Sequence, residues 1–352
     1  MPDDTNLFHW ATSELSQDAF ICWLLSHADN TCAAKNPAMH NAGLMFLNAF
    51  MHSAGEAPLS SATVKVIKQL MHCDIVAEIN SDLILIIEDK TSTSEHGQQL
   101  RRYRESIGEK YKDRKILCFY CKTGNQSDFT HAEKQGYKPF LRKNLLDVLR
   151  NIKAAGTEHD VINDFLEYLE DIEKKTQAFL VLPPDQWDGR AWQGFFMALQ
   201  SVFTDLRWNY VPNQSGGFTG AWWHFMPVPN VEGWRIYLQA EEKRLVAKII
   251  CSDKNPDSKI CRNIRERCFK ALDLTSRNDG IKITRPGRSG NGRSMTAAII
   301  TDGDQDWLKL HEDGIIDMNA TIGFLRKALV FLDRTRTALL SHPPAPAELP
   351  PA

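Results

Sequence analysis

The sequence contains neither a long apolar run nor a strong excess of one charge. Its uninterrupted apolar runs are short, for example Leu83 to Ile87, whereas a helix needs roughly 20 apolar residues to cross a bilayer, so we expect no contact with a membrane. The first residues, MPDDTNLFHW, lack a basic segment followed by an apolar one, and we therefore expect no secretory signal and a cytoplasmic protein. The 42 basic and 44 acidic residues leave a net charge of −2. This balance excludes a bulk polycation that coats nucleic acid, but it does not exclude an enzyme whose basic residues gather on one face.

The sequence also lacks the cysteine pattern of a disulfide framework. Its eight cysteines are scattered through the chain, and we expect them to be reduced, mostly buried thiols. Cys118 and Cys121 form a CxxC pair, but the surrounding KILCFYCK is typical of a strand. Residues three apart on a strand point to opposite faces, so we expect neither a zinc knuckle nor a redox pair there.

The first half of the chain has the element order of an α/β fold. Helices are expected at residues 13–27 and 42–52, strands at 62–70, 72–79 and 83–90, a helix at 93–107, a strand at 115–122 and helical segments at 143–175. The helix at 93–107 has a capping-box pattern at Ser92 and Glu95 and is expected to end at Gly108. The order of helix, three strands, helix and strand predicts an α/β sandwich around a mixed sheet.

The composition changes at Pro183 and Pro184, beyond which tryptophan and glycine become frequent. Strands are expected at residues 219–226, 233–240, 243–250, 280–285 and 295–301, and helices near 190–205, 257–273 and 318–340. The last stretch, HPPAPAELPPA, is rich in proline and has almost nothing to bury. We therefore divide the chain into a first domain over 1–178, an α+β C-terminal domain over 179–340 and a disordered tail over 341–352.

Two carboxylates are expected to face each other in the first domain. If residues 80–82 form a hairpin turn centred on Ser81, strand positions that sum to 162 are paired, and this places Asp74 opposite Glu88. Lys90 projects from the same strand face as Glu88. Two buried carboxylates this close repel each other unless they share a proton or have a basic neighbour or a divalent cation. A cross-strand ion pair on a solvated edge is the alternative, but the apolar run LILII before Glu88 argues against a solvated edge.

These residues also occur in a known order. CDI at 73–75, IIEDK at 86–90 and QLRRY at 99–103 resemble the RecB-type branch of the PD-(D/E)XK nuclease superfamily, over about residues 10–125. TSELSQDAFICWLL at 12–25 resembles the first helix of that family. Cys73 stands where the family often has proline, at a position that supplies no ligand. The resemblance implies a restriction-endonuclease-like αβββαβ core with a mixed sheet, followed by the second α+β domain.

The resemblance assigns roles to these positions. Asp74, Glu88, the backbone carbonyl of Asp89 and Glu14 would hold Mg²⁺ or Mn²⁺, because oxygen ligands suit these ions. Lys90 would orient a water molecule and stabilise the charge that develops on the phosphate. Gln99 and Tyr103 share one helix face and would fix Lys90 or touch the nucleic-acid backbone. Plain packing is the alternative for Tyr103, and a favourable helix N-terminal charge is the alternative for Glu14.

Further parts of this region have weaker assignments. The Asp89 side chain is expected on the opposite strand face, away from the metal. Free N–H groups at residues 93–95 could hold a phosphate, whereas His96 is expected to be an ordinary surface residue.

Basic residues are concentrated in two segments, 99–122 and 259–293. The second segment contains RPGRSGNGRS, a glycine-rich loop that could approach a phosphate backbone closely. The candidates for contact with nucleic acid are Arg101, Arg102, Arg285, Arg288 and Arg293; a solvated basic face is the alternative. The tryptophans of the second domain could stack on bases, but core packing is the more usual role at these spacings.

Together these features predict a Mg²⁺-dependent nuclease that acts on nucleic acid, DNA rather than RNA, in restriction, repair or anti-phage defence. A homodimer is possible. One alternative is a nuclease fold without catalysis that serves as a DNA-binding or regulatory module. Another is a protein–protein adaptor built on the tryptophan-rich domain, which predicts a large exposed apolar patch there.

Overall fold

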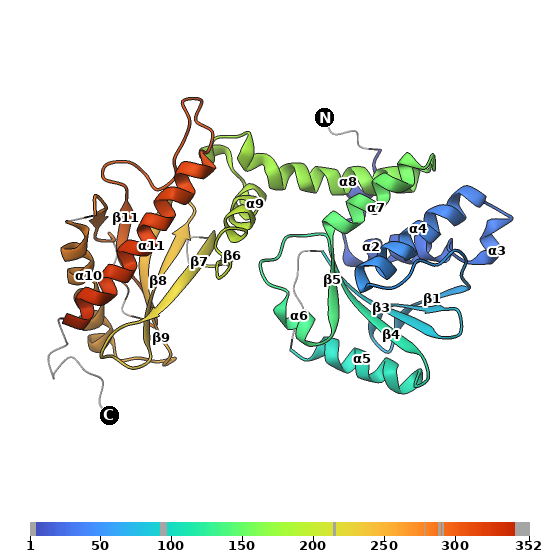
Figure 1. The fold of residues 1–352 in the computed structure, drawn as a ribbon, viewed down its shortest axis with the longest axis horizontal. Helices are drawn as coiled ribbons and strands as arrows, with labels where there is room; N and C mark the ends of the chain where they lie inside the picture. Colours follow the sequence, from blue (N-terminus) through green and yellow to red (C-terminus); the bar gives the residue numbers. More distant parts are fainter. Residues whose placement is uncertain are drawn as a thin grey trace. The chain divides into compact units, whose positions relative to one another are not determined.

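The computed structural model describes residues 5–91, 97–213, 216–277, 279–287, 290 and 292–341. The chain separates into two compact units, Met1–Lys174 and Lys175–Ala352. Each unit contains its own sheet and its own hydrophobic core (Figure 1). No helix in the described part of the chain is long and apolar enough to span a bilayer.

The first unit is built on a five-stranded mixed sheet with the order β1-β2-β3-β4-β5. The strands are β1 (Val64–Leu70), β2 (Cys73–Ile79), β3 (Leu83–Lys90), β4 (Lys115–Lys122) and β5 (Tyr137–Leu141). The pairings β1–β2 and β2–β3 are antiparallel, whereas β3–β4 and β4–β5 are parallel. Every residue of β3 is buried, as expected for a central strand that is covered on both faces.

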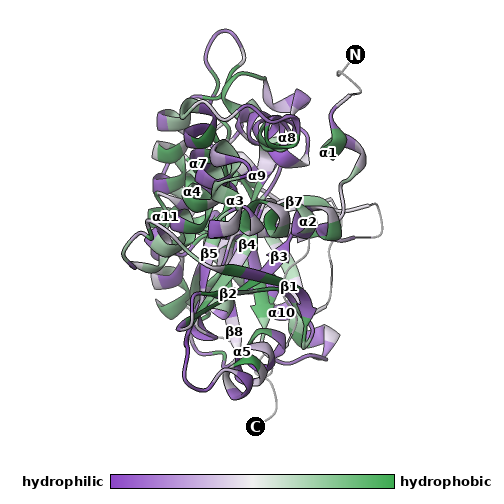
Figure 2. Cartoon of the chain, turned by 90° about the vertical axis from the view of Figure 1, so that its right-hand side faces the viewer, coloured by the Kyte–Doolittle hydropathy of each residue, from purple (hydrophilic) through white to green (hydrophobic). Residues whose placement is uncertain are grey.

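Helices cover both faces of this sheet (Figure 1). They are α1 (Leu7–Trp10), α2 (Glu14–Ser26), α3 (Asn30–Ala33), α4 (Pro37–Ala54), α5 (Gln99–Lys110), α6 (Thr130–Lys134), α7 (Arg142–Ala154) and α8 (Asp160–Gln177). α2, α4, α7 and α8 form one core with one sheet face, and α5 and α6 form a second core with the other face. Hydrophilic residues predominate along the outer side of α5 (Figure 2). The α/β sandwich predicted from the element order is confirmed.

Several boundaries differ from the sequence predictions. α5 continues past Gly108 to Lys110, because Gly108 does not adopt the left-handed conformation that would end the helix there. Residues 92–96, with the predicted cap, lie outside the described residues. α4 begins at Pro37, five residues earlier than expected, where Asn36 accepts a hydrogen bond from the Met39 N–H. β5 was not predicted, because a proline such as Pro139 argues against a strand. Proline is tolerated here because β5 lies at the edge of the sheet.

The second unit contains a six-stranded antiparallel sheet with the order β10-β11-β9-β8-β7-β6. Its strands are β6 (Arg207–Val211), β7 (Phe218–Pro227), β8 (Trp234–Glu241), β9 (Arg244–Cys251), β10 (Lys282–Thr284) and β11 (Ser294–Thr301). Its helices are η1 (Ala178–Leu180), η2 (Pro184–Gln186), α9 (Gly189–Gln200), α10 (Ser258–Ser276) and α11 (Met318–Ser341). The five predicted strands are present, and β6 is an additional edge strand.

Most tryptophans of the second unit are in its core. Trp187, Trp192, Trp208, Trp223, Trp234 and Trp307 are all buried in one cluster. Trp222 is half-buried and does not belong to that cluster. The eight cysteines are free. Cys118 and Cys121 lie in different cores on opposite faces of the sheet, as expected for their spacing on a strand.

Candidate active site

The β2–β3 hairpin brings Asp74 and Glu88 together. The strands pair Ile75 with Ile87 and Val76 with Ile86, which is the register expected for a turn centred on Ser81. This register leads from Ile75 and Ile87 directly to Asp74 and Glu88. The Asp89 N–H donates a hydrogen bond to Asp74 Oδ2 at 2.9 Å, so the end of β3 is tied to the start of β2.

The Lys90 ammonium lies among four oxygen-bearing groups. Its Nζ is 2.9 Å from Glu88 Oε1, 3.5 Å from Asp74 Oδ2 and 3.7 Å from Glu14 Oε2. It also donates a hydrogen bond to the Asp89 carbonyl oxygen at 2.7 Å. We call these five residues the Lys90 cluster. Burial alone would lower the pKa of Lys90, but the carboxylates of Glu88, Asp74 and Glu14 raise it above its ordinary value.

Glu88 of the Lys90 cluster is completely inaccessible to solvent. Its Oε1 accepts hydrogen bonds from Lys90 and, at 2.9 Å, from Gln99 Nε2. Its Oε2 is buried and has no hydrogen-bond partner among the described residues. Burial, and next the charge of Asp74, raise the pKa of Glu88 to about 7, although Lys90 opposes the shift.

Asp89 contributes its backbone to the Lys90 cluster and its side chain to the other face of the sheet. The side chain is fully buried, and its Oδ1 accepts a hydrogen bond from Gln17 Nε2 of α2. Gln17 Oε1 in turn accepts a hydrogen bond from Thr123 Oγ1 at 2.8 Å. Burial, and next the charge of Asp18, raise the pKa of Asp89 well above its ordinary value. The side chain therefore points away from Glu88, and its hydrogen bond with Gln17 of α2 fixes the position of the Asp89 peptide group.

Helix α2 supplies three polar side chains to this region. Ser13 caps the helix by accepting a hydrogen bond from the Ser16 N–H. Glu14 follows at the first helical position, and its Oε1 accepts a hydrogen bond from the Thr91 N–H at 3.2 Å. Gln17 and Asp18 are both buried. We did not predict these two residues, although their i+3 and i+4 spacing from Glu14 places all three on one helix face.

Gln99 and Tyr103 approach the Lys90 cluster from α5. Gln99 Nε2 is shared between Glu88 Oε1 and Tyr103 Oη, the latter at 3.0 Å. Gln99 thus holds Glu88 rather than Lys90. Burial is the largest cause that raises the pKa of Tyr103. The predicted phosphate-binding N–H groups at 93–95 and His96 lie outside the described residues.

Comparison with known proteins agrees with this geometry. Residues 5–178 match a family model described as PD-(D/E)XK nuclease superfamily. Residues 5–178 belong to the PD-(D/E)XK nuclease superfamily. No curated protein and no solved structure matches the chain. The matched residues span the first unit, so this finding says nothing about the second one.

Nucleases of the PD-(D/E)XK superfamily generally use divalent metals, and the donor set of the Lys90 cluster fits such an ion. Its ligand groups are oxygen atoms, three carboxylates surround one ammonium, and Glu88 Oε2 is buried with no hydrogen-bond partner in the part of the chain that the structure describes. As the side chains stand, no three His, Cys, Asp or Glu residues of the described ranges close on a common point suited to a metal. Lys90 instead serves as the counter-cation of the carboxylates.

The five arginines proposed for nucleic-acid contact have different surroundings. Arg101 pairs with Glu105 one turn away on α5, and Arg102 is exposed. Arg285 pairs with Glu266 at 2.9 Å and stacks on Phe269. Arg293 Nε donates a hydrogen bond to the Cys251 carbonyl at 2.9 Å, and Arg288 lies outside the described residues. Arg101 and Arg102 thus belong to the first unit, and Arg285 and Arg293 belong to the second.

Proposed function

We propose that the chain is a divalent-metal-dependent nuclease that hydrolyses phosphodiester bonds, with DNA as the preferred substrate. The observation that carries the proposal is the Lys90 ammonium among Glu14, Asp74, Glu88 and the Asp89 carbonyl, in a region that belongs to the PD-(D/E)XK superfamily. The settings we favour are restriction, repair and anti-phage defence in the cytoplasm. A homodimer would allow both strands of a duplex to be cut.

Each residue of the Lys90 cluster has a defined part in this proposal. Asp74, Glu88, Glu14 and the Asp89 carbonyl would hold Mg²⁺ or Mn²⁺, and when bound such an ion would polarise a phosphoryl oxygen and lower the pKa of a water molecule. Lys90 is protonated, because neighbouring carboxylates raise its pKa, and it stabilises the negative charge on the phosphate as water attacks and the bond to the leaving oxygen breaks. Gln99 keeps the Glu88 carboxylate oriented through its hydrogen bond to Oε1.

A cleavage panel tests the proposal. The full chain is incubated with circular and linear duplex DNA, single-stranded DNA and RNA, in Mg²⁺, in Mn²⁺ and in EDTA. We expect metal-dependent cleavage of DNA and a loss of at least about 100-fold in rate for Lys90→Ala, the scale found when one charge-stabilising donor is removed. Lys112→Ala, at an exposed lysine in the turn before β4, is the matched control and should cut at the parent rate.

The same panel separates the catalytic proposal from its alternative. If no substrate is cut in either metal, or if Lys90→Ala cuts as fast as the parent chain, the proposed activity is wrong. A thermal melt with Mn²⁺ then identifies what remains: no stabilisation by Mn²⁺ would favour a nuclease fold that serves only as a binding or regulatory module.

A further inference from the structure

The six-stranded sheet of the second unit has two unlike faces. Alternate strand residues, such as Ile236, Leu238 and Ala247, form one core cluster with the buried residues of α9, α10 and α11. The residues between them point to the opposite side. We call this side the open face, defined by Trp222, Phe225, Tyr237, Gln239, Glu241 and Lys248, none of which belongs to that cluster.

A connected set of polar groups fixes the centre of the open face. Glu241 is 9% exposed and accepts hydrogen bonds from Gln239 Nε2 at 3.1 Å and from Arg244 Nη2 at 2.6 Å. Lys248 Nζ lies 3.4 Å from the same carboxylate. The Tyr237 hydroxyl is 3.4 Å from Gln239 Oε1. Two cations thus surround one carboxylate, which leaves the centre of the face positive.

A β-bulge places an aromatic ring on this face. The β7–β8 register shifts between Trp223 and Met226, and His224 within the shift has a φ of +60°, a strained value for a residue other than glycine. The bulge brings Phe225 onto Tyr237, with ring centroids 4.3 Å apart and planes 15° apart. Phe225 remains 42% exposed, so one face of its ring is open to solvent. Trp222, paired in register with Gln239, is half-buried beside them.

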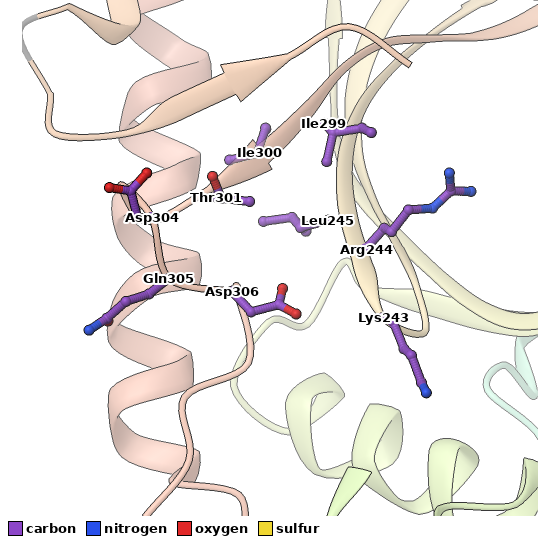
Figure 3. Close-up of a pocket in the computed structure, with 9 residues that line it drawn as sticks. All are labelled: Lys243, Arg244, Leu245, Ile299, Ile300, Thr301, Asp304, Gln305 and Asp306. Atoms are coloured by element: carbon purple, nitrogen blue, oxygen red, sulfur yellow. The ribbon is translucent and has the colours of Figure 1, made fainter. Parts of the chain in front are cut away.

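A hollow that contains an arginine lies at each end of the strands of the open face. At one end, the exposed Arg235 and Phe225 line a hollow of about 700 Å³, a size typical of ligand pockets. At the other end, a hollow of about 340 Å³ contains Arg244 together with Asp304 and Asp306. Figure 3 shows that the Arg244 guanidinium points away from both aspartates, and Asp304 pairs with Lys282 instead. Arg235, Arg244 and Lys248 therefore outnumber the single Glu241 carboxylate on the strands at the middle of this face.

We propose that the open face is a stacking platform for single-stranded nucleic acid. The exposed Phe225 ring and the half-buried Trp222 ring, beside the cations Arg235, Arg244 and Lys248, match a strand whose bases are unstacked and whose backbone is anionic. Trp222 and Phe225 would each stack on a base, while Arg235, Arg244 and Lys248 would contact phosphates. A duplex buries its base faces, so it fits this surface poorly. The inference rests on the proposed function for the class of ligand, but it assigns a different site.

Binding to a labelled oligonucleotide tests the platform. The full chain is titrated into a fluorescein-labelled 20-residue oligothymidylate in EDTA, and anisotropy is measured at two salt concentrations. We expect the parent chain to bind, an equal-length duplex to compete weakly, and Phe225→Ala and Trp222→Ala each to weaken binding by about 5- to 150-fold. The control is Tyr210→Ala, at a 55% exposed aromatic residue that alternates with Asn209 of the open face and should bind like the parent.

A readout without substitutions covers the case in which a variant fails to fold. The same oligonucleotide carrying 5-bromouracil is crosslinked to the parent chain by ultraviolet light, and the attached peptide is identified by mass spectrometry. Attachment within residues 218–251, which span β7, β8 and β9, supports the platform, whereas attachment elsewhere overturns it. No binding in EDTA, or equal binding by the parent and by folded Phe225→Ala and Trp222→Ala, also overturns it.

These outcomes are separate from those of the cleavage panel. If Lys90→Ala abolishes cleavage but the ring substitutions leave oligonucleotide binding unchanged, the nuclease proposal stands and the platform is wrong. If no substrate is cut but the ring substitutions weaken binding, the platform stands without the activity.

Discussion

Asp18 is a carboxylate that the fold buries without a full set of partners. It is 2% exposed, its Oδ1 has no hydrogen-bond partner within the described ranges, and Lys68 Nζ lies 3.8 Å from its Oδ2. Burial, and next the charge of Asp74, raise its pKa from 3.8 to about 6. Between about pH 4 and pH 6 the unfolded chain therefore binds fewer protons at this position than the folded chain does. The free energy of unfolding must fall as the pH rises across that window.

Asp18→Asn should consequently stabilise the protein at neutral pH. The amide has a similar shape and no charge to desolvate, so we expect the free energy of unfolding at pH 7 to rise by roughly 1–2 kcal/mol. Near pH 3 the parent carboxyl is neutral as well, and the two proteins should be equally stable. Urea unfolding in EDTA at both pH values measures the difference. A gain of the same size at pH 3 would show that packing, not ionisation, is the cause.

Single residues also show what the sequence could predict about the site. The position of Asp74 opposite Glu88 could be predicted from the hairpin turn alone. The centre of a hairpin fixes which residues are paired, and side chains alternate between the two faces of a strand. The burial of Gln17 and Asp18 did not follow, because it depends on which turn of α2 lies over Asp89. Likewise, the strand end EDK predicts that Lys90 lies beside Glu88, but not that its ammonium also reaches Glu14.

At the scale of elements, the position of α2 depends on its contact with α4. A Cβ built on Gly43 of α4 would lie 2.4 Å from the Ala28 backbone nitrogen and 2.6 Å from the His27 carbonyl carbon. These are backbone atoms just beyond the end of α2, so they cannot rotate away as a flexible side chain would. The close approach of α4 to the end of α2 thus requires glycine at this position, and α2 bears Glu14 and Gln17.

Gly43→Ala should therefore push α2 away from α4. We expect a loss of about 1–3 kcal/mol in the stability of the first unit, the usual cost of overpacking. Gly108→Ala in α5 is the matched control: its Cβ would make an ordinary contact with Ile116, and alanine should stabilise the helix by about 0.5–1 kcal/mol. Urea unfolding followed by far-ultraviolet circular dichroism measures both variants. Equal stability of Gly43→Ala and the parent would mean that the two helices separate at no cost.

The elements were predictable where the chain itself carries the signal. β2, β3 and β4 appear as short runs of apolar and β-branched residues between turn residues, and their bounds were predicted within one residue. β5 and β6 are edge strands with mixed polarity, so their pairing depends on neighbours far along the chain. Gly108 failed as a helix end because it keeps a helical conformation and does not adopt the left-handed one that ends many helices.

For the whole molecule, the structure shows which basic residues behind the net charge of −2 already have partners inside the protein. The basic segment 259–293 is in part consumed by internal contacts: Arg265 and Arg267 donate hydrogen bonds to backbone carbonyls, and Arg285 pairs with Glu266. These contacts hold the arginine side chains against the protein itself, so they explain part of the basic segment without any bound nucleic acid. A count of charges along the sequence cannot separate them from a free basic surface, because both give the same composition.

The two units have separate cores, and their tryptophans are unevenly divided. Trp10 and Trp23 belong to the first unit, whereas the other seven of the nine belong to the second. Unfolding followed by tryptophan fluorescence therefore reports mainly on the second unit, whereas far-ultraviolet circular dichroism reports on both. We expect the two probes to give different midpoints in urea, because neither core cluster of the first unit includes a residue of the second.

The Gly43→Ala variant makes this expectation decisive. Its substitution lies in the first unit, so it should lower the midpoint of one circular-dichroism transition and leave the fluorescence midpoint unchanged. Gly323→Ala in α11, where a Cβ meets nothing within 4 Å, should instead raise the fluorescence midpoint together with the other circular-dichroism transition, by the gain of alanine over glycine in a helix. If both probes fall together and Gly43→Ala shifts them equally, the chain unfolds as one cooperative body. The second sheet, with its open face, would then depend on the stability of the first unit and would not fold independently of it.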